Sequence, residues 1–387
     1  MSQPLVDRVR ARLVAGHEDA TPGRVASALR AEGIVLGDEA VLSLVESLRR
    51  ELVGAGPLQA LLQEPDVTDV LVNGPDAVWI DRGRGLERAT AGFGSDVEVR
   101  RLAQRLAAAV GRRLDDATPY VDARLVDGTR LHAVIAPIAT DGTVISLRVP
   151  RRQAFTLPDL VRLGSIDEFG AAWLRALVEA RLAFIVSGGT GTGKTTVLAS
   201  LLGLVPHEER IIMVEDSAEL LPDHPHVVRL QSRLANIEGA GAITMRELVR
   251  QSLRMRPDRI VVGEVRGPEV IELLSALNTG HEGGCGTIHA NSADDVPARI
   301  EALGLTAGLD RTAVHALLGA GLDAVIHLQR ERSGQRLVAG IYSLHRDDRG
   351  MVHARPALRS RDGVMSGEAG RPSLAERIER AGVPAPL

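Results

Sequence analysis

Hydrophobic positions follow three different patterns along the chain, and each pattern marks a separate segment. Residues 2–53 place apolar side chains at intervals of three and four, as an amphipathic helix does. Residues 58–150 change to short runs of alternating apolar and polar residues around one helical stretch. From residue 169 onward, helical stretches alternate with short runs that are continuously apolar. This order predicts a small helical module, then an α+β domain, then an α/β domain with a mostly parallel sheet.

The bounds of the expected elements follow from these runs and from the turn residues between them. In the α+β segment we expect a helix at 95–110 and strands at 67–72, 77–80, 121–126, 130–136 and 144–149. In the α/β segment we expect strands at 183–187, 210–214, 259–262, 324–328 and 337–344, with helices at 169–181, 244–255 and 269–278 and one that ends at 204. The predicted division is a helical module at 1–53, an α+β domain at 54–150, a linker at 151–168, an α/β domain at 169–360 and a loosely held tail at 361–387.

Composition narrows the class of protein. Of the 387 residues, 44% are hydrophobic and 25% are charged, which is typical of a soluble globular protein. No apolar run reaches the ~18 residues of a membrane-spanning helix, and the N-terminus lacks the hydrophobic core of a signal peptide, so we expect a cytoplasmic protein with only peripheral membrane contact. A net charge of -4 and an aromatic content of 2% argue against direct binding of nucleic acid. The single cysteine, Cys285, excludes a disulfide framework, and we expect it to be a small buried hydrophobic residue.

A glycine-rich loop follows the apolar run at 183–187. The sequence from Gly188 to Thr195 fits the pattern G-x-x-x-x-G-K-[ST], in which backbone N–H groups and a helix N-terminus surround a phosphate. Lys194 is the only lysine in the chain, and its compact ammonium suits phosphates where the planar guanidinium of arginine does not. Thr195 offers a hydroxyl to Mg²⁺, so ATP with Mg²⁺ is the expected ligand. The predicted nucleotide contacts are Gly188, Gly189, Thr190, Gly191, Thr192, Gly193, Lys194, Thr195 and Thr196.

Polar side chains follow three other apolar strands. Glu215 comes directly after the run at 210–214, Glu264 follows the run at 259–262 after one glycine, and His289 comes directly after the run at 285–288. Because ligands of an open parallel sheet bind beyond the carboxyl ends of the strands, these side chains are expected near the glycine-rich loop. Phosphoryl transfer to water needs a carboxylate that orients the water. Glu264 is the first candidate for this role and also a candidate partner of Mg²⁺, and Glu215 is the second; His281 and His289 are candidates for contact with the terminal phosphate or with a neighbouring carboxylate.

Four sequence boxes occur in an order that one superfamily shares. They are the glycine-rich loop at 188–195, an acidic run at 212–219, the segment 253–266 around Glu264, and the histidine-containing segment 279–291. Together they resemble the Walker A, Asp, Walker B and His boxes of the ATPases that power type II secretion, type IV pilus assembly and type IV secretion. Further upstream, the segments 56–58, 68–74 and 122–132 look most like the Tad/Flp pilus (CpaF-type) branch. The tetracysteine zinc element of the type II secretion ATPases is absent from this sequence, which favours the Tad-like or type IV secretion branches.

The resemblance implies a RecA-like P-loop NTPase domain preceded by a smaller α+β domain, in a homo-hexamer that docks on a platform protein of the inner membrane. It also implies that strand arginines of the smaller domain reach the phosphates. In this chain that role falls on Arg130 and Arg148, with Arg124 as a further candidate. The expected function is a Mg²⁺-dependent ATPase that powers assembly of a Tad or type IV-like pilus, or type II/IV secretion.

Three alternatives remain open from the sequence. A conjugation-type ATPase would keep the enzyme and change the cargo to a DNA-transfer channel, although the charge and the few aromatic residues argue against direct contact with DNA. An ATP-gated scaffold would bind the nucleotide and hardly hydrolyse it, and the full set of acidic and histidine boxes argues against that. A RecA-type recombinase shares the fold class, but the α+β domain before the loop does not fit it.

Overall fold

The computed structural model describes residues 22–31, 54–83, 85–149, 154–233, 240–331 and 333–387. The chain divides into two compact units, residues 1–151 and 152–387, and each is described here by itself. Of the helical module expected at 1–53, the described part is helix α2 (Pro22–Ala31), and the remaining residues lie outside the described ranges.

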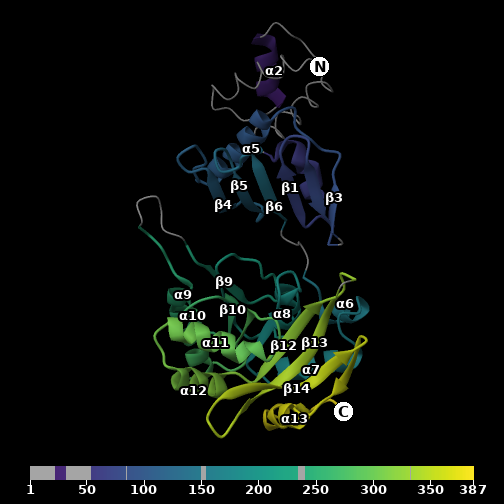
Figure 1. Ribbon diagram of the computed structural model, residues 1–387, viewed down its shortest axis with the longest axis vertical. Coiled ribbons are helices and arrows are strands. Elements are labelled where there is room, and N and C mark those ends of the chain that lie inside the picture. The colour runs from purple at the N-terminus through teal and green to yellow at the C-terminus, as the bar shows by residue number, and fades with distance from the viewer. Residues whose placement is uncertain (1–21, 32–53, 84, 150–153, 234–239, 332) are drawn as a thin grey trace. The chain divides into compact units, whose positions relative to one another are not determined.

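The first unit is built on a six-stranded antiparallel sheet in the order β3-β2-β1-β6-β5-β4 (Figure 1). Its elements are the 3₁₀ helix Gly56–Leu58, α4 (Gln59–Gln63), β1 (Asp69–Asn73), β2 (Val78–Asp81), β3 (Leu86–Arg88), α5 (Asp96–Ala109), β4 (Tyr120–Arg124), β5 (Arg130–Val134) and β6 (Val144–Arg148). These strands and α5 confirm the expected elements to within two residues, apart from β3, which the sequence pattern did not reveal. One face of the sheet packs on α5, where Val99, Leu102 and Leu106 are buried against apolar strand residues. The other face carries polar side chains.

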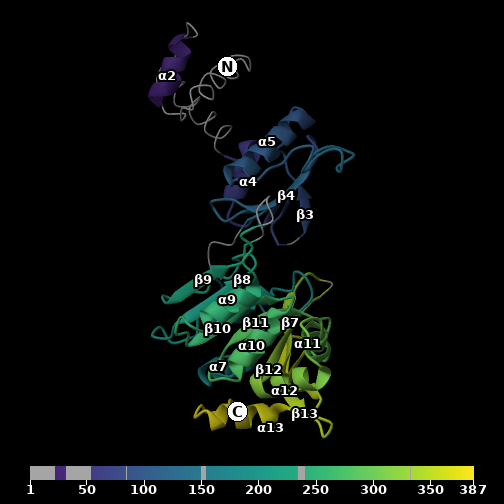
Figure 2. The ribbon, with the colours of Figure 1, turned by 90° about the vertical axis from the view of Figure 1, so that its left-hand side faces the viewer.

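The second unit contains a nine-stranded sheet in the order β15-β14-β13-β12-β7-β11-β10-β8-β9. Its strands are β7 (Phe184–Gly188), β8 (Ile211–Glu215), β9 (Val227–Gln231), β10 (Arg259–Val265), β11 (Cys285–His289), β12 (Ala324–Arg330), β13 (Arg336–Arg346), β14 (Val352–Arg361) and β15 (Val364–Gly367). The run from β9 to β12 is parallel, and β13 to β15 are antiparallel. Figure 2 shows these parallel strands side by side. The fold class expected from the sequence is therefore confirmed.

Helices cover both faces of this sheet, because its central strands are apolar on both sides. The helices are α6 (Leu157–Arg162), α7 (Glu168–Glu179), α8 (Lys194–Leu202), α9 (Met245–Ser252), α10 (Glu269–Leu277), α11 (Asp295–Thr306), α12 (Arg311–Gly321) and α13 (Arg371–Arg380). Residues of α6, α7, α8 and α13 share one buried cluster, and residues of α9 to α12 share the other. Successive strand residues alternate between the two clusters, as with Phe184 and Ile185 of β7. Among the described residues, no helix is both long and apolar enough to cross a bilayer.

The end of the chain corrects one expectation. The segment 361–387 was expected to be a loosely held tail, and this is wrong: it contains β15 and helix α13, and Leu374 and Ile378 of α13 are fully buried. The Gly and Pro residues that suggested a tail instead form a turn at Asp362-Gly363 and the start of a helix at Pro372. The expected linker is also shorter than 151–168, because α6 packs its Leu157 and Leu160 into the second unit.

Candidate active site

The loop between β7 and α8 is shaped by three glycines with backbone angles that other residues rarely adopt. The angle φ is +150° at Gly188, +72° at Gly191 and +95° at Gly193. A Cβ at Gly188 would lie 2.7 Å from the carbonyl oxygen of Leu328 on β12, so a larger residue would force a shift. Helix α8 begins at Lys194, directly after the loop. A glycine-rich loop that runs into a helix N-terminus is the arrangement that binds phosphate.

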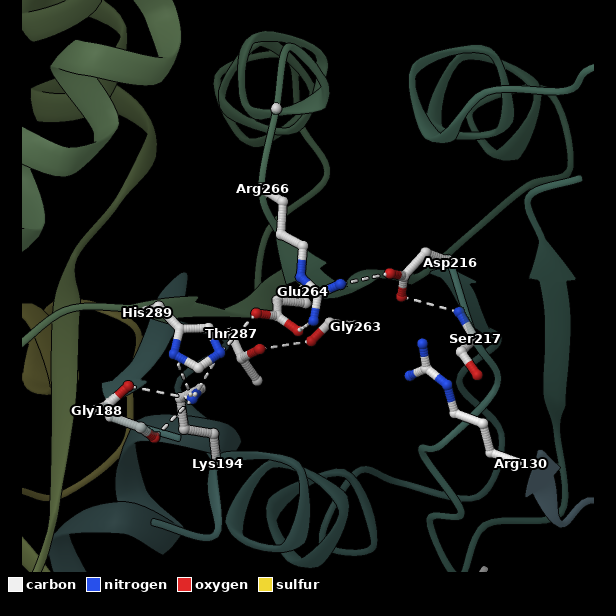
Figure 3. Close-up of polar contacts among 12 residues, drawn as sticks. Arg130, Gly188, Lys194, Asp216, Ser217, Gly263, Glu264, Arg266, Thr287 and His289 are labelled. Carbon is white, nitrogen blue, oxygen red and sulfur yellow. Dashed lines mark hydrogen bonds and ion pairs between the residues drawn. The ribbon is translucent and has the colours of Figure 1, made fainter. Parts of the chain in front are cut away.

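Lys194 lies against this loop and is only 8% exposed. Its Nζ donates to the carbonyl oxygens of Gly188 and Gly189 at 3.1 and 3.0 Å. The same nitrogen lies 3.4 and 3.3 Å from the two ring nitrogens of His289 (Figure 3). Burial lowers the pKa of the Lys194 ammonium, and the nearby carboxylate of Glu264 opposes this shift. A cation that is partly removed from water in this way interacts strongly with a phosphate.

Glu264 stands between two cationic or basic side chains. Its Oε1 is 2.8 Å from Nε2 of His289, and its Oε2 accepts a hydrogen bond of 2.5 Å from Arg266. Arg266 also donates to Oδ2 of Asp216 at 2.8 Å. Figure 3 shows the resulting chain of contacts, which runs from Lys194 through His289, Glu264 and Arg266 to Asp216.

These residues meet because the strands that carry them are neighbours. β7, β11, β10 and β8 lie next to one another in the sheet and are parallel, so their carboxyl ends share one edge. The loop follows β7, His289 ends β11, and Glu264 lies near the end of β10. The structure therefore brings together Lys194, Glu264 and His289, as the strand-end argument predicts. Their catalytic roles stay predictions.

Two further candidates are Glu215, which ends β8, and His281, which lies in the loop that follows α10. Glu215 is 3% exposed, and its Oε1 accepts hydrogen bonds from the backbone nitrogens of Glu219 and Leu220 at 2.8 and 2.9 Å. A carboxylate that receives two backbone N–H groups fixes the conformation of the following loop. His281 follows α10 in a turn, where its backbone nitrogen donates to Ala276.

The arginine candidates lie on the open face of the sheet in the first unit. Cross-strand pairing places Asp69, Arg148, Arg130 and Arg124 in one row across β1, β6, β5 and β4. Arg130 forms a two-point ion pair with Asp122, at 3.2 and 2.9 Å. Arg148 donates through Nε to Asp69 at 3.1 Å, and Arg124 donates to the carbonyl of Gly128 in the β4–β5 turn. Arg130 and Arg148 line a cavity of about 540 Å³ on this face with Asp69, Asp122 and His132.

The polar groups around the loop fit a nucleotide with its Mg²⁺ better than a metal site formed by protein side chains alone. The hydroxyls of Thr195 and Thr196 stand in the first turn of α8, where Thr195 would hold Mg²⁺. Among the described residues there is no cluster of three or more His, Cys, Asp or Glu side chains that could hold a metal ion. Both oxygens of Glu264 contact His289 or Arg266, so Glu264 fits an indirect role toward the metal better than direct ligation. The remaining ligands of the ion would be phosphate oxygens and water.

Sequence reasoning missed Arg266, although the signal was present. It lies two residues after Glu264 at the same strand end, where the pairing of β10 with β11 is irregular between Val262 and Val265.

The prediction for Cys285 is confirmed: the side chain is 1% exposed, and burial raises the pKa of its thiol to about 12. A thiol of this kind is chemically inert at neutral pH.

Comparisons with known proteins show the family of the chain. A family model described as "Type II/IV secretion system protein" matches residues 51–378. A protein of Mycobacterium tuberculosis, provisionally named a conjugal transfer protein, is 55% identical over 326 residues, covering 83% of this chain and 92% of the relative. The type IV secretion system protein PtlH of Bordetella pertussis is 33% identical over 310 residues, covering 72% and 90%.

Two solved structures share the fold. The ATPase DotB of Legionella pneumophila matches with a TM-score of 0.52 and 19% identity, over 79% of this chain and 82% of that one. The pilus retraction motor PilT with bound ADP matches with a TM-score of 0.52 and 19% identity, over 84% and 86%. The family match includes the whole network from Lys194 to Asp216.

Proposed function

The chain belongs to the type II/IV secretion system protein family, and we propose that it is a Mg²⁺-dependent ATPase. This is the superfamily that its sequence boxes resemble. We propose further that it works as a hexamer on the cytoplasmic face of a membrane, where it drives a secretion or pilus platform. The observation that carries the proposal is the series of contacts between Lys194, His289 and Glu264 beside a phosphate-binding loop. A protein that only bound phosphate would need the loop and the lysine, but not a carboxylate held next to them.

Each residue of this network has a defined task in the proposed reaction. The loop amides and Lys194 bind the phosphates of ATP. Glu264 orients the attacking water, and His289 holds Glu264 in place through its contact with Oε1. Thr195 would hold Mg²⁺, which would neutralise negative charge on the phosphates. Arg130 and Arg148 then stabilise the negative charge that grows in the transition state.

Two variants separate binding from hydrolysis. We expect Lys194→Ala to lose ATP binding, because it removes the compact cation of the loop. We expect Glu264→Gln to bind ATP and to lower kcat by at least about 10²-fold, because the amide cannot orient and activate water as the carboxylate does. ATP binding and steady-state turnover are measured for both. Glu208→Gln, the same change at an exposed position of the second unit, is the matched control and should behave as the unchanged protein.

The outcomes discriminate among the alternatives. Normal turnover in Glu264→Gln would move the catalytic role to Glu215 or another carboxylate. Tight ATP binding without turnover in the unchanged protein, at any concentration, would support the ATP-gated scaffold instead.

The cargo is a separate proposal, and two observations favour different answers. The names of the relatives from M. tuberculosis and B. pertussis favour a conjugation-type or type IV secretion machine. The segments 68–74 and 122–132 favour a Tad/Flp pilus. With a net charge of -4, we expect the motor to act on a membrane protein rather than on DNA itself. Turnover should then be unchanged by added DNA, whereas stimulation of several-fold would indicate direct contact with the transferred strand.

A further inference from the structure

The hairpin formed by β12 and β13 runs along the P-loop. β12 pairs in parallel with β7, and Leu328 stands opposite Gly188, the first glycine of the loop. β13 begins at Arg336, which pairs with Arg330 across the hairpin. The hairpin thus places Arg330 and Arg336 near the P-loop, although Arg336 is 145 residues away from Gly191 in the sequence.

Arg336 makes a direct contact with the loop backbone. Its Nε donates to the carbonyl oxygen of Gly191 at 3.0 Å. In a trans peptide unit the C=O and the following N–H point in opposite directions. A donor that holds the carbonyl of Gly191 on one side therefore holds the N–H of Thr192 on the side away from Arg336. In a loop of this type the N–H groups are the groups that bind phosphate.

This peptide unit needs such a restraint because it follows a glycine. Gly191 has a φ of +72°, and glycine moves between conformations at little steric cost. The neighbouring Thr192 is fixed in part by its hydroxyl, which donates to the carbonyl of Gly189 at 2.9 Å. The contact from Arg336 restrains the same turn from the outside, and its positive charge strengthens the hydrogen bond.

The start of β13 is itself attached to the core of the unit. Gln335 Nε2 donates to the carbonyl of Gly164 at 3.1 Å, and the backbone nitrogen of Val338 donates to that of Ser165 at 2.8 Å. Both acceptors lie within three residues of the end of α6, which buries Leu157 and Leu160. Arg336 is therefore presented to the loop from a strand that is held on both sides of it.

We propose that Arg336 is a positioning residue for phosphate binding: it fixes the peptide between Gly191 and Thr192 so that the Thr192 N–H is oriented for the phosphates before the nucleotide arrives. This inference rests on the proposed function, because it concerns the same loop. It predicts a loss of nucleotide affinity rather than of chemistry. A loop that is no longer oriented in advance must be ordered by the ligand, which weakens binding.

The test compares two arginines of the same hairpin. Arg336→Met keeps the apolar stem and removes the donor, and Arg330→Met removes the same charge. Among the described residues, Arg330 makes no hydrogen bond to the loop, although a Cβ at Gly191 would lie 3.8 Å from its Nη1. We expect Arg336→Met to raise the dissociation constant for ADP, measured by titration of the full-length protein, by about tenfold. Arg330→Met should change it by less than about twofold, and kcat at saturating ATP should be nearly unchanged in both.

Two results would overturn the proposal. Equal losses of affinity in both variants would show that only the positive charge near the loop matters, and unchanged affinity in Arg336→Met would show that the contact does not order the loop. Arg336→Lys keeps the charge but lacks the Nε donor, so it should bind ADP about as weakly as the Met variant if the contact, and not the charge, orders the loop. A nearly unchanged kcat of Arg336→Met at saturating ATP guards against a folding defect. Lys194→Ala serves as the reference for the proposed function: if it too leaves ADP binding intact, the loop is not the nucleotide site and the proposed function fails as well.

Discussion

At the scale of single residues, His289 determines how the site responds to pH. Burial and the neighbouring ammonium of Lys194 lower the pKa of His289 below its ordinary value of 6.5, and Glu264 opposes this shift. Arg266 and Arg299 add to the lowering. The ring is therefore neutral at neutral pH, and its protonation would add a cation beside Lys194 and turn the contact with Glu264 into an ion pair.

We predict that kcat is constant near neutral pH and falls only once the pH drops below the ordinary imidazole range, because protonated His289 holds Glu264 away from water. The folded protein binds fewer protons at this site than the unfolded chain, so the same titration also lowers stability as the pH falls through 6.5 and below. A pH profile of kcat from about pH 5 to 8 checks this. In His289→Asn the acid limb should be lost, whereas an unchanged limb would assign it to another group.

Local sequence predicted some of these residues well and others not at all. Spacing identified the loop around Lys194, and the rule for strand ends identified Glu264 and His289. Glu215 satisfied the same rule, yet its carboxylate bonds to backbone nitrogens of its own loop. Arg336 was missed because its contact with Gly191 spans 145 residues, and no local pattern reveals which of many arginines returns to the loop.

At the scale of elements, the open face of the first sheet presents Arg130 and Arg148 in pairs with carboxylates. Asp69 engages Arg148 through Nε alone, and the side chain of Arg148 is 62% exposed. An exposed pair of this kind contributes roughly 1 kcal/mol or less, so a phosphate can replace or share the carboxylate at little cost.

We predict that Arg148→Gln lowers kcat by at least about tenfold and changes the dissociation constant for ATP much less, because transition-state charge is what an added cation stabilises. Steady-state kinetics and equilibrium binding of ATP measure the two effects. Arg100→Gln breaks an ion pair with Asp116 from helix α5 of the same unit and is the control. Equal losses in both variants would point to a general defect of the unit rather than to a catalytic arginine.

Helix α13 is the element whose importance the sequence most underestimated. It offers only Leu374 and Ile378 at helical spacing among charged residues, a pattern too short to distinguish a packed helix from a polar tail. The buried surface that decides the matter is supplied by distant residues of the same core, including Trp173 and Ala357. Long helices and buried strands were predictable because the pattern of apolar residues within each of them is long enough to identify it.

We predict that Ile378→Ala lowers the free energy of unfolding by about 2–4 kcal/mol, because it leaves a cavity beneath a fully buried side chain. Urea unfolding of the full-length protein measures the change. Arg380→Ala on the same helix removes only an exposed pair with Glu376 and should cost no more than about 0.5 kcal/mol. If the two variants were equally stable, α13 would not be part of the cooperative core.

At the scale of the whole molecule, the chain separates its two kinds of chemistry. The second unit holds the loop, Lys194, Glu264 and His289, while Arg130 and Arg148 belong to the first. This division fits the proposed hexamer, in which the arginines of one subunit would complete the site of its neighbour. The number of subunits and the cargo are features that the residues of one chain do not encode in any local pattern.

We predict that specific ATPase activity rises with protein concentration and reaches a plateau once the ring is filled, because an isolated chain lacks the arginines of its neighbour. Mixing Lys194→Ala with Arg148→Gln provides a sharper test. Each variant alone should be nearly inactive, and the mixture should regain measurable turnover, since the Arg148→Gln chain keeps an intact loop and the Lys194→Ala chain keeps an intact arginine. Glu264→Gln is the blank for both measurements. The prediction fails if the mixture stays at the level of the blank and the activity of the unchanged protein does not depend on its concentration. Each chain would then complete its own site, and the argument for a ring would be lost.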